Sequence, residues 1–194
     1  GDWKNVKINN YSYNDGYENG ERRSILQYAI FEYGGFSQND DWYQKNLLQA
    51  YFDATIMNCS FRKSQNSALW IGSDRCTDEN PSVVHACNFN NNQSVGLYVR
   101  NGHNTQITAN NIVNNGDRGI YVQDKTCTIN DNYFYNNNIQ HIYYRPWHEG
   151  HTGYISNNIF QNGSAIFAAT GGYNLPGNIN FNNNHLYDSS IVIH

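Results

Sequence analysis

The sequence predicts an all-β solenoid, a single domain in which short strands wind into stacked coils. Three observations predict it: a repeated phrase, the spacing of its apolar residues, and an apolar-polar alternation that closes each copy. The phrase is clearest in HACNFNNNQSVGLYVRN, TANNIVNNGDRGIYVQD and NDNYFYNNNIQHIYYRP, between Val83 and Arg145. The apolar residues that mark these copies are Phe89, Ile112 and Phe134, at spacings of 23 and 22 residues. Because a repeat of this length cannot bury its apolar face alone, neighbouring copies are expected to stack into one core.

The composition fits one domain across residues 1–194. Of these residues 39% are hydrophobic, 15% aromatic and only 14% charged. Disordered chains are instead poor in aromatic residues and rich in charge. The net charge of -4 offers no basic surface to a nucleic acid, and no apolar run reaches membrane-spanning length. The sequence therefore predicts no nucleic-acid partner and no membrane span.

Further copies lie on both sides of the three clear ones. The opening WKNVKINN predicts a strand at 6–8, and insertions at 36–45 and 146–153 interrupt the period. Together with the opening strand, the copies predict about eight coils. The predicted markers are Phe31, Phe61, Phe89, Ile112, Phe134, Ile159 and Leu186.

In the strand that closes each copy, the alternation predicts which side chains lie in the core and which lie on the outside. Successive side chains in a strand point to opposite faces, so Leu97 and Val99 point inward and Tyr98 points outward. Such an outward row is either a flat surface for a sugar chain or a protein, or a strip covered by a loop such as 36–45. The aromatic row comprises Trp70, Tyr98, Tyr121, Tyr143 and Phe167.

A second column lies two residues before each marker. It holds Cys59 and Cys87 in the earlier copies and asparagines in the later ones. An asparagine amide at a repeated bend can donate a hydrogen bond to the next one along the stack. The predicted internal ladder comprises Asn110, Asn132, Asn157 and Asn184.

The cysteines show no CxxC pair, which argues against a zinc site. Parallel side chains on adjacent coils hold their Cβ atoms too far apart for an unstrained disulfide. Cys59 and Cys87 are therefore predicted to be free, buried thiols. Cys76 and Cys127 lie in or beside turns, and the sequence does not pair them.

The periodic phrase NxI...GIYV resembles the right-handed parallel β-helix of the pectate-lyase-like superfamily, in its carbohydrate-binding and sugar-hydrolase repeat type. YAIFEYGG and the opening WKNVKI are similar to phrases in large bacterial surface proteins of that class. The resemblance covers nearly the whole chain and implies a right-handed parallel β-helix that is extracellular or on the cell surface. It implies no particular activity, because these phrases encode coils and turns.

The second insertion, RPWHEGH, holds the best catalytic candidates. It gathers Arg145, Trp147, His148, Glu149 and His151 beside the end of a coil. A polysaccharide lyase needs a base for the sugar C5 proton and a cation near the carboxylate, and these residue types supply both. PWHE is similar to the DPHE motif of alginate C5-epimerases, but the Asp is missing, so no role is transferred. Whether the protein is an enzyme is left open.

Two more charged residues, Arg100 and Asp124, lie at the ends of neighbouring coils. They are expected to line one groove with Arg145. In the alternative interpretation Arg145 pairs with Asp124, and His148 and His151 are ordinary loop residues.

The same insertion contains potential metal ligands, since imidazole and carboxylate commonly bind metal ions. The spacing of His148 and His151 suits a helix, which this loop is not expected to form. Calcium, which many relatives of the resembled family use, needs several oxygen ligands, and no dense acidic cluster falls on aligned coils. The sequence predicts no metal and no cofactor, with calcium as the alternative.

Together these patterns predict a non-catalytic module that binds a polysaccharide or a surface protein. One alternative is a lyase or epimerase acting on uronate polymers. The other is a subunit that stacks end to end into filaments, because neither end carries a capping helix; excision from a longer surface protein would also explain this. The predicted ligand-binding residues are Trp70, Tyr98, Tyr121, Tyr143, Phe167, Arg100, Asp124 and Trp147.

Overall fold

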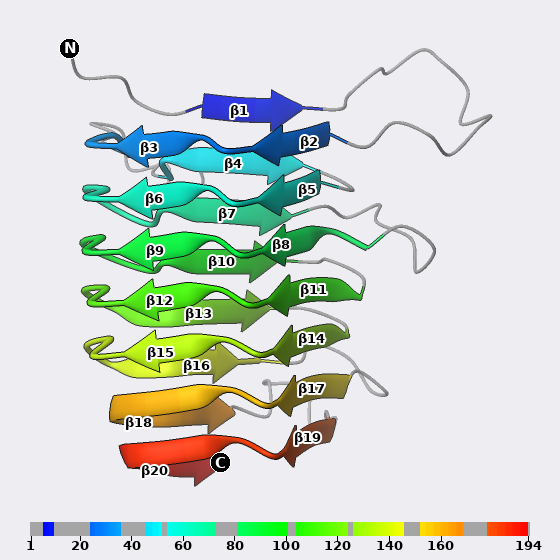
Figure 1. Cartoon of the computed structure of the whole chain (residues 1–194), viewed down its shortest axis with the longest axis vertical. Coiled ribbons are helices and arrows are strands. Elements are labelled where there is room, and N and C mark those ends of the chain that lie inside the picture. The colour runs from blue at the N-terminus through cyan, green and yellow to red at the C-terminus, as the bar shows by residue number, and fades with distance from the viewer. Residues whose placement is uncertain are drawn as a thin grey trace.

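The computed structural model describes residues 6–9, 24–35, 46–51, 54–72, 81–100, 104–123, 126–145, 152–168 and 178–193. Every regular element in these ranges is a β-strand, and the strands pair in parallel. Figure 1 shows them as flat coils stacked along one axis, from the blue N-terminal end to the red C-terminal end. The predicted fold class, an all-β parallel β-helix, is confirmed.

Each coil contributes one strand to each of three stacks. The opening stack contains β2 (Ser24–Gln27), β5 (Ala54–Met57), β8 (Val83–His85), β11 (Thr105–Thr108), β14 (Cys127–Asn130), β17 (Thr152–Ser156) and β19 (Asn178–Asn182). The marker stack contains β3 (Ile30–Glu32), β6 (Ser60–Arg62), β9 (Asn88–Asn90), β12 (Asn111–Val113) and β15 (Tyr133–Tyr135). The closing stack contains β1 (Val6–Asn9), β4 (Leu48–Tyr51), β7 (Leu69–Gly72), β10 (Leu97–Arg100), β13 (Arg118–Gln123) and β16 (Gln140–Tyr144).

The last two coils join the marker and closing stacks. β18 (Ile159–Ala168) pairs with both β15 and β16, and β20 (His185–Ile193) pairs along β18, so one 13-stranded sheet results. The opening stack is a separate 7-stranded sheet. The described strands thus complete slightly fewer coils than the predicted number of about eight, because β1 alone represents the first coil in the described ranges.

The core lies between the stacks and follows the predicted alternation. Leu97 and Val99 are fully buried, as are the corresponding residues of neighbouring coils. In the marker stack, Phe61 lies parallel to the ring of Phe89, with centroids 5.0 Å apart. Stacking identical apolar residues at each coil buries what a single coil would expose, which is the main stabilising contribution in a solenoid.

Each coil bends twice in the same way, before and after its marker strand. At the first bend one residue adopts the left-handed region, with φ of 55° at Ala109 and 57° at Asp131. The next residue, Asn110 or Asn132, returns to the interior and is almost completely buried. Asn and Asp tolerate the left-handed conformation better than other residues with a Cβ, which explains their frequency at these bends.

A first Asn ladder, formed by Asn110, Asn132, Asn158 and Asn184, runs along this bend. Each side-chain Nδ2 donates to the Oδ1 of the next asparagine, at 2.9 Å from Asn110 to Asn132 and 3.0 Å in the following steps. The same Oδ1 atoms also accept from the backbone N–H of the preceding rung, at 2.9 Å. The ladder therefore satisfies amides that would otherwise be buried without partners.

The prediction placed Asn157 in this ladder, and it is wrong by one residue. Asn157 is exposed and takes the left-handed bend position, with φ of 55°. The predicted marker Ile159 likewise points outward, at 39% exposure, and Phe160 replaces it in the core. The phrase NNIF permits both registers, but only the observed one stacks Phe160 on Phe134, with centroids 4.9 Å apart.

A second Asn ladder, formed by Asn92, Asn115 and Asn137, runs along the bend after the marker strands. Its Nδ2 to Oδ1 distances are 2.9 and 2.8 Å. At its end, Asn137 Nδ2 lies 3.0 Å from His141 Nδ1. Because the amide nitrogen can only donate, this contact assigns Nδ1 as an acceptor and makes the neutral imidazole the matching partner.

The cysteine prediction for Cys59 and Cys87 is confirmed. Both are free and about 1% exposed, and Cys127 is also a free, buried thiol. Burial raises the pKa of Cys87 to about 12, so it remains a neutral thiol. Cys87 also continues the first Asn ladder, because its backbone N–H donates to Asn110 Oδ1 at 2.8 Å. Cys76 lies outside the described residues.

The observed register predicts that substitution by glycine has a large effect on stability at Asn158 and a small one at Asn157. Asn158→Gly should lower the free energy of unfolding by about 2 kcal/mol or more, because it removes an amide that makes several buried hydrogen bonds. Asn157→Gly should change it by less than about 0.5 kcal/mol, because glycine tolerates the left-handed bend at an exposed position. Urea unfolding of both variants measures the difference. Equal destabilisation of the two would contradict the register.

The histidine at the end of the second Asn ladder predicts a dependence of stability on pH. Burial lowers the pKa of His141 from 6.5 to about 4, so the unfolded chain takes up this proton at a higher pH than the folded one. The stability that neutral His141 contributes is fully present above pH 6.5 and is lost progressively as the pH falls from 6.5 to about 4.

This loss should amount to about 2–3 kcal/mol between neutral pH and pH 4. His141→Gln retains an acceptor for Asn137 but cannot take up the proton, so its stability should fall less over the same range. Parallel curves of unfolding free energy against pH for the two proteins would disprove this role of His141.

Candidate ligand-binding site

The aromatic row lies on consecutive strands of the closing stack, as the sequence predicts. Backbone pairing places Trp70 beside Tyr98, and Tyr98 beside Tyr121. Tyr143 and Phe167 follow on the next two strands. The row therefore crosses β7, β10, β13, β16 and β18 at one level of each strand.

The two ends of the row differ in exposure. Trp70 and Tyr98 are each only 7% exposed, and Gln49, at the same level of β4, is fully buried. Tyr121 and Tyr143 are half-buried. The prediction that the whole row is exposed is thus wrong for Trp70 and Tyr98, and the accessible part begins at Tyr121. Residues 36–45, predicted to be one cover, lie outside the described residues.

Trp70 and Tyr98 are held rigidly in their places. A Cβ added at Gly72 would lie 2.4 Å from the Trp70 ring, so the absence of a side chain there makes room for the indole. The Tyr98 and Tyr121 rings stack with centroids 4.7 Å apart and an angle of 14° between their planes. The Tyr98 hydroxyl donates to Gln123 Oε1 at 2.5 Å, and Gln123 Nε2 donates to the Tyr121 hydroxyl at 2.7 Å. This chain of hydrogen bonds fixes both rings.

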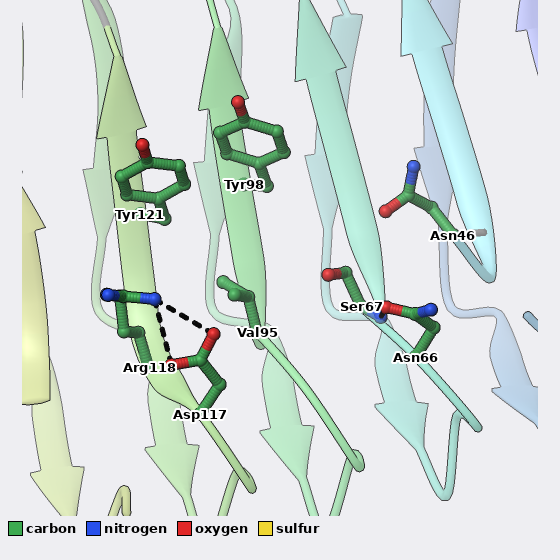
Figure 2. A pocket seen from close by; sticks show the side chains of 8 residues that line it. All are labelled: Asn46, Asn66, Ser67, Val95, Tyr98, Asp117, Arg118 and Tyr121. Atoms are coloured by element: carbon green, nitrogen blue, oxygen red, sulfur yellow. Dashed lines mark hydrogen bonds and ion pairs between the residues drawn. The ribbon is translucent and has the colours of Figure 1, made fainter. Parts of the chain in front are cut away.

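A shallow groove lies beside the row, towards the turns that precede the closing strands. It has a volume of about 330 Å³ and spans β4, β7, β10 and β13 (Figure 2). In Figure 2 the Tyr98 and Tyr121 rings, the aromatic wall of the groove, lie on neighbouring strands, and the amide, hydroxyl and charged groups, its polar wall, lie nearer the turns that precede the closing strands. The groove is lined by Asn46, Asn66, Ser67, Val95, Tyr98, Asp117, Arg118 and Tyr121.

The charged groups of the groove are paired with each other. Arg118 Nη1 donates to both carboxylate oxygens of Asp117, each at 2.9 Å. Its Nε donates to Gln140 Oε1 at 3.1 Å. The guanidinium lies over the ring of Tyr143, at 4.7 Å from the centroid, and over that of Tyr121, at 5.4 Å. Arg118 therefore joins the ion pair to the aromatic row.

The second Asn ladder determines where the ion pair of Asp117 and Arg118 lies. Asn115 is fixed in the ladder, and the following Gly116 N–H donates to Asn92 O at 2.8 Å. A Cβ at Gly116 would lie 2.4 Å from the carbonyl oxygen of Gln93, so the turn requires glycine at this close approach. Asp117 and Arg118 follow directly and enter β13, which positions both at the rim of the groove.

The Tyr121 hydroxyl stays protonated at neutral pH. Burial raises its pKa, and the neighbouring Tyr143 raises it further, whereas Arg145 and Arg118 act in the opposite direction. The hydroxyl is therefore a neutral hydrogen-bonding group at the edge of the ring wall.

The predicted catalytic residues fall mostly outside the described residues. These are Trp147, His148, Glu149 and His151, and the predicted groove residue Asp124 is outside them too. Arg145 follows β16 and is half-buried, with its backbone N–H donating to Val122 O at 2.8 Å. Arg100 ends β10 at the level of Gln123. Arg100 and Arg145 thus lie beyond the aromatic row, and neither lines the groove.

The polar wall of the groove is not among the site residues predicted from the sequence. Asp117 and Arg118 occur in NNGDRGIYV, immediately before an assigned strand, and Asn66 and Ser67 occupy the corresponding turn of an earlier coil. Backbone pairing sets Arg118 beside Gln140, and the Gly96 N–H donates to Arg118 O at 3.0 Å. These residues occupy the same positions relative to the marker of their coil, and this repeat could have identified the polar wall from the sequence.

In the part of the chain that the structure describes, no helix is long and apolar enough to cross a membrane. Among the same residues, no group of three or more His, Cys, Asp and Glu side chains is arranged to hold a metal ion.

The burial of Tyr98 predicts a structural role for this residue. Tyr98→Ala should lower the free energy of unfolding by about 3 kcal/mol, because it opens a cavity under the groove. Tyr98→Phe should cost about 1 kcal/mol, because it removes only the hydrogen bond to Gln123. Chemical denaturation measures both. An unchanged stability of Tyr98→Ala would show that this ring is exposed.

Comparison with known proteins agrees with this architecture. A family model described as a right-handed β-helix region matches residues 43–186. No curated protein and no solved structure matched the chain. The match covers most of the chain and is consistent with the resemblance to the pectate-lyase-like superfamily. The chain therefore belongs to the right-handed β-helix family.

Proposed function

We propose that this protein is a non-catalytic, extracellular or cell-surface module that binds a polysaccharide in the groove of the closing stack. The observation that carries the proposal is the pairing of one stacked aromatic wall with one polar wall across neighbouring coils. Its location outside the cell rests on the resemblance to surface proteins of the β-helix class.

The geometry suits a sugar chain for two reasons. Tyr121 is the accessible ring of the stacked Tyr98 and Tyr121 pair, and it offers an apolar surface with a fixed orientation against which the C–H face of a sugar can pack. The facing amide, hydroxyl and ion-pair groups can donate to and accept from sugar hydroxyls. The groove crosses four strands at about 4.8 Å each, so it runs for roughly 14 Å along the coil axis. An elongated, shallow site of this kind fits a linear polymer.

The half-buried Tyr121 is the residue to test. Tyr121→Ala should weaken polysaccharide binding about tenfold, because it removes the accessible ring of the apolar wall. The polysaccharide in question is the one that retards the unmodified protein in a gel. The measurement is gel electrophoresis in the presence of a panel of soluble neutral and acidic polysaccharides.

Tyr135→Ala is the matched control. Tyr135 is also half-buried and also stacks on a tyrosine, Tyr133 at 6.4 Å, but it lies on the marker stack. The control should bind as the unmodified protein does. If no polymer in the panel retards the protein, or if both variants lose binding equally, the proposed site is wrong. A new unsaturated product, detected by its absorbance in the same mixtures, would instead favour the lyase alternative.

A further inference from the structure

The described lining of the groove holds charged groups and yet carries no net charge. Among the described residues that line it, only Asp117 and Arg118 are charged, and they neutralise each other at 2.9 Å. Both side chains are about one quarter exposed, so a ligand can reach a pair that is partly shielded from water. From this arrangement, and given the proposed function, we infer that the groove selects uncharged polysaccharides and that Asp117 is the residue that excludes uronate polymers.

A uronate carboxylate would find one cation among the described groove residues, Arg118, and this cation already neutralises Asp117. Moving a carboxylate out of water costs free energy unless a paired charge compensates it. The Arg118 Nη1 group already serves both oxygens of Asp117, and its Nε serves Gln140. A uronate bound beside Arg118 would also lie beside the Asp117 carboxylate, and like charges repel.

A neutral sugar meets no such cost. Its hydroxyls can donate to the remaining lone pairs of Asp117, and they can accept from Arg118 Nη2, which has no partner among the described residues. Asn66 contributes another donor, its Nδ2, since its Oδ1 already accepts from the Ser67 N–H. The ion pair therefore acts as a combined donor and acceptor for hydroxyl groups.

The cations outside the groove do not change this result. Arg100 and Arg145 lie at the far side of the aromatic row, and both already interact with neighbouring groups. For Arg145 these include the Tyr121 hydroxyl. The overall charge of -4 also disfavours a polyanion.

The test compares neutral and acidic polymers that are otherwise closely matched. Methyl-esterified and de-esterified homogalacturonan share sugar and linkage, and neutral mannan with polymannuronate forms a second pair. The unmodified protein should be retarded more strongly by the neutral member of a pair. Stronger retardation by the acidic member would overturn the inference and leave the proposed binding function standing. Absence of retardation by any polymer would overturn the proposed function itself, and the inference with it.

Asp117→Asn tests the assigned residue directly. Releasing Arg118 from its partner should raise affinity for the acidic polymer about tenfold, and added salt should abolish the gain. Asp131→Asn is the control, since it makes the same charge change at an exposed bend outside the groove. If Asp131→Asn produces the same gain, or Asp117→Asn produces none while remaining folded, Asp117 does not determine specificity.

Discussion

The stacking of buried asparagine amides is the interaction on which the rest of this structure depends. Backbone hydrogen bonds alone would hold neighbouring coils together in several registers, because every residue carries the same donor and acceptor. The ladder through Asn110 and Asn132 accepts only one register, since a slip by one residue would bury amides without partners. The position of each outward side chain on the closing stack follows from that choice.

The second Asn ladder connects this register to the groove. Asn115 fixes the bend, Gly116 makes the tight approach, and Asp117 and Arg118 follow at the rim. The polar wall is thus set by buried amides a few residues away, and the aromatic wall by the alternation of the closing strands. Because contacts within the fold set the positions of both walls, the selectivity proposed for the groove follows from fixed charges and not from adaptation to the ligand.

The sequence was sufficient for the fold and for the row of aromatic residues, because both follow from strict periodicity. It was insufficient where two neighbouring residues have the same chemistry: NNIF contains adjacent asparagines and adjacent apolar residues, so Asn157 was assigned in place of Asn158. The second Asn ladder was missed although an asparagine occurs three residues after Phe89, Ile112 and Phe134. The exposure of the outward aromatic row could not be predicted, because the burial of Trp70 depends on tertiary packing that the strand alternation does not encode.

The central claim is that the accessible part of the aromatic row and the adjacent ion pair form the contact surface for a polysaccharide. Hydroxyl-radical footprinting in the presence of fragments of the retained polymer tests it most directly. The account predicts reduced oxidation of Tyr121 and Tyr143, with Tyr133 and Tyr135 on the marker stack unchanged. Protection of the marker stack, or none at Tyr121 while the polymer is bound, would contradict it.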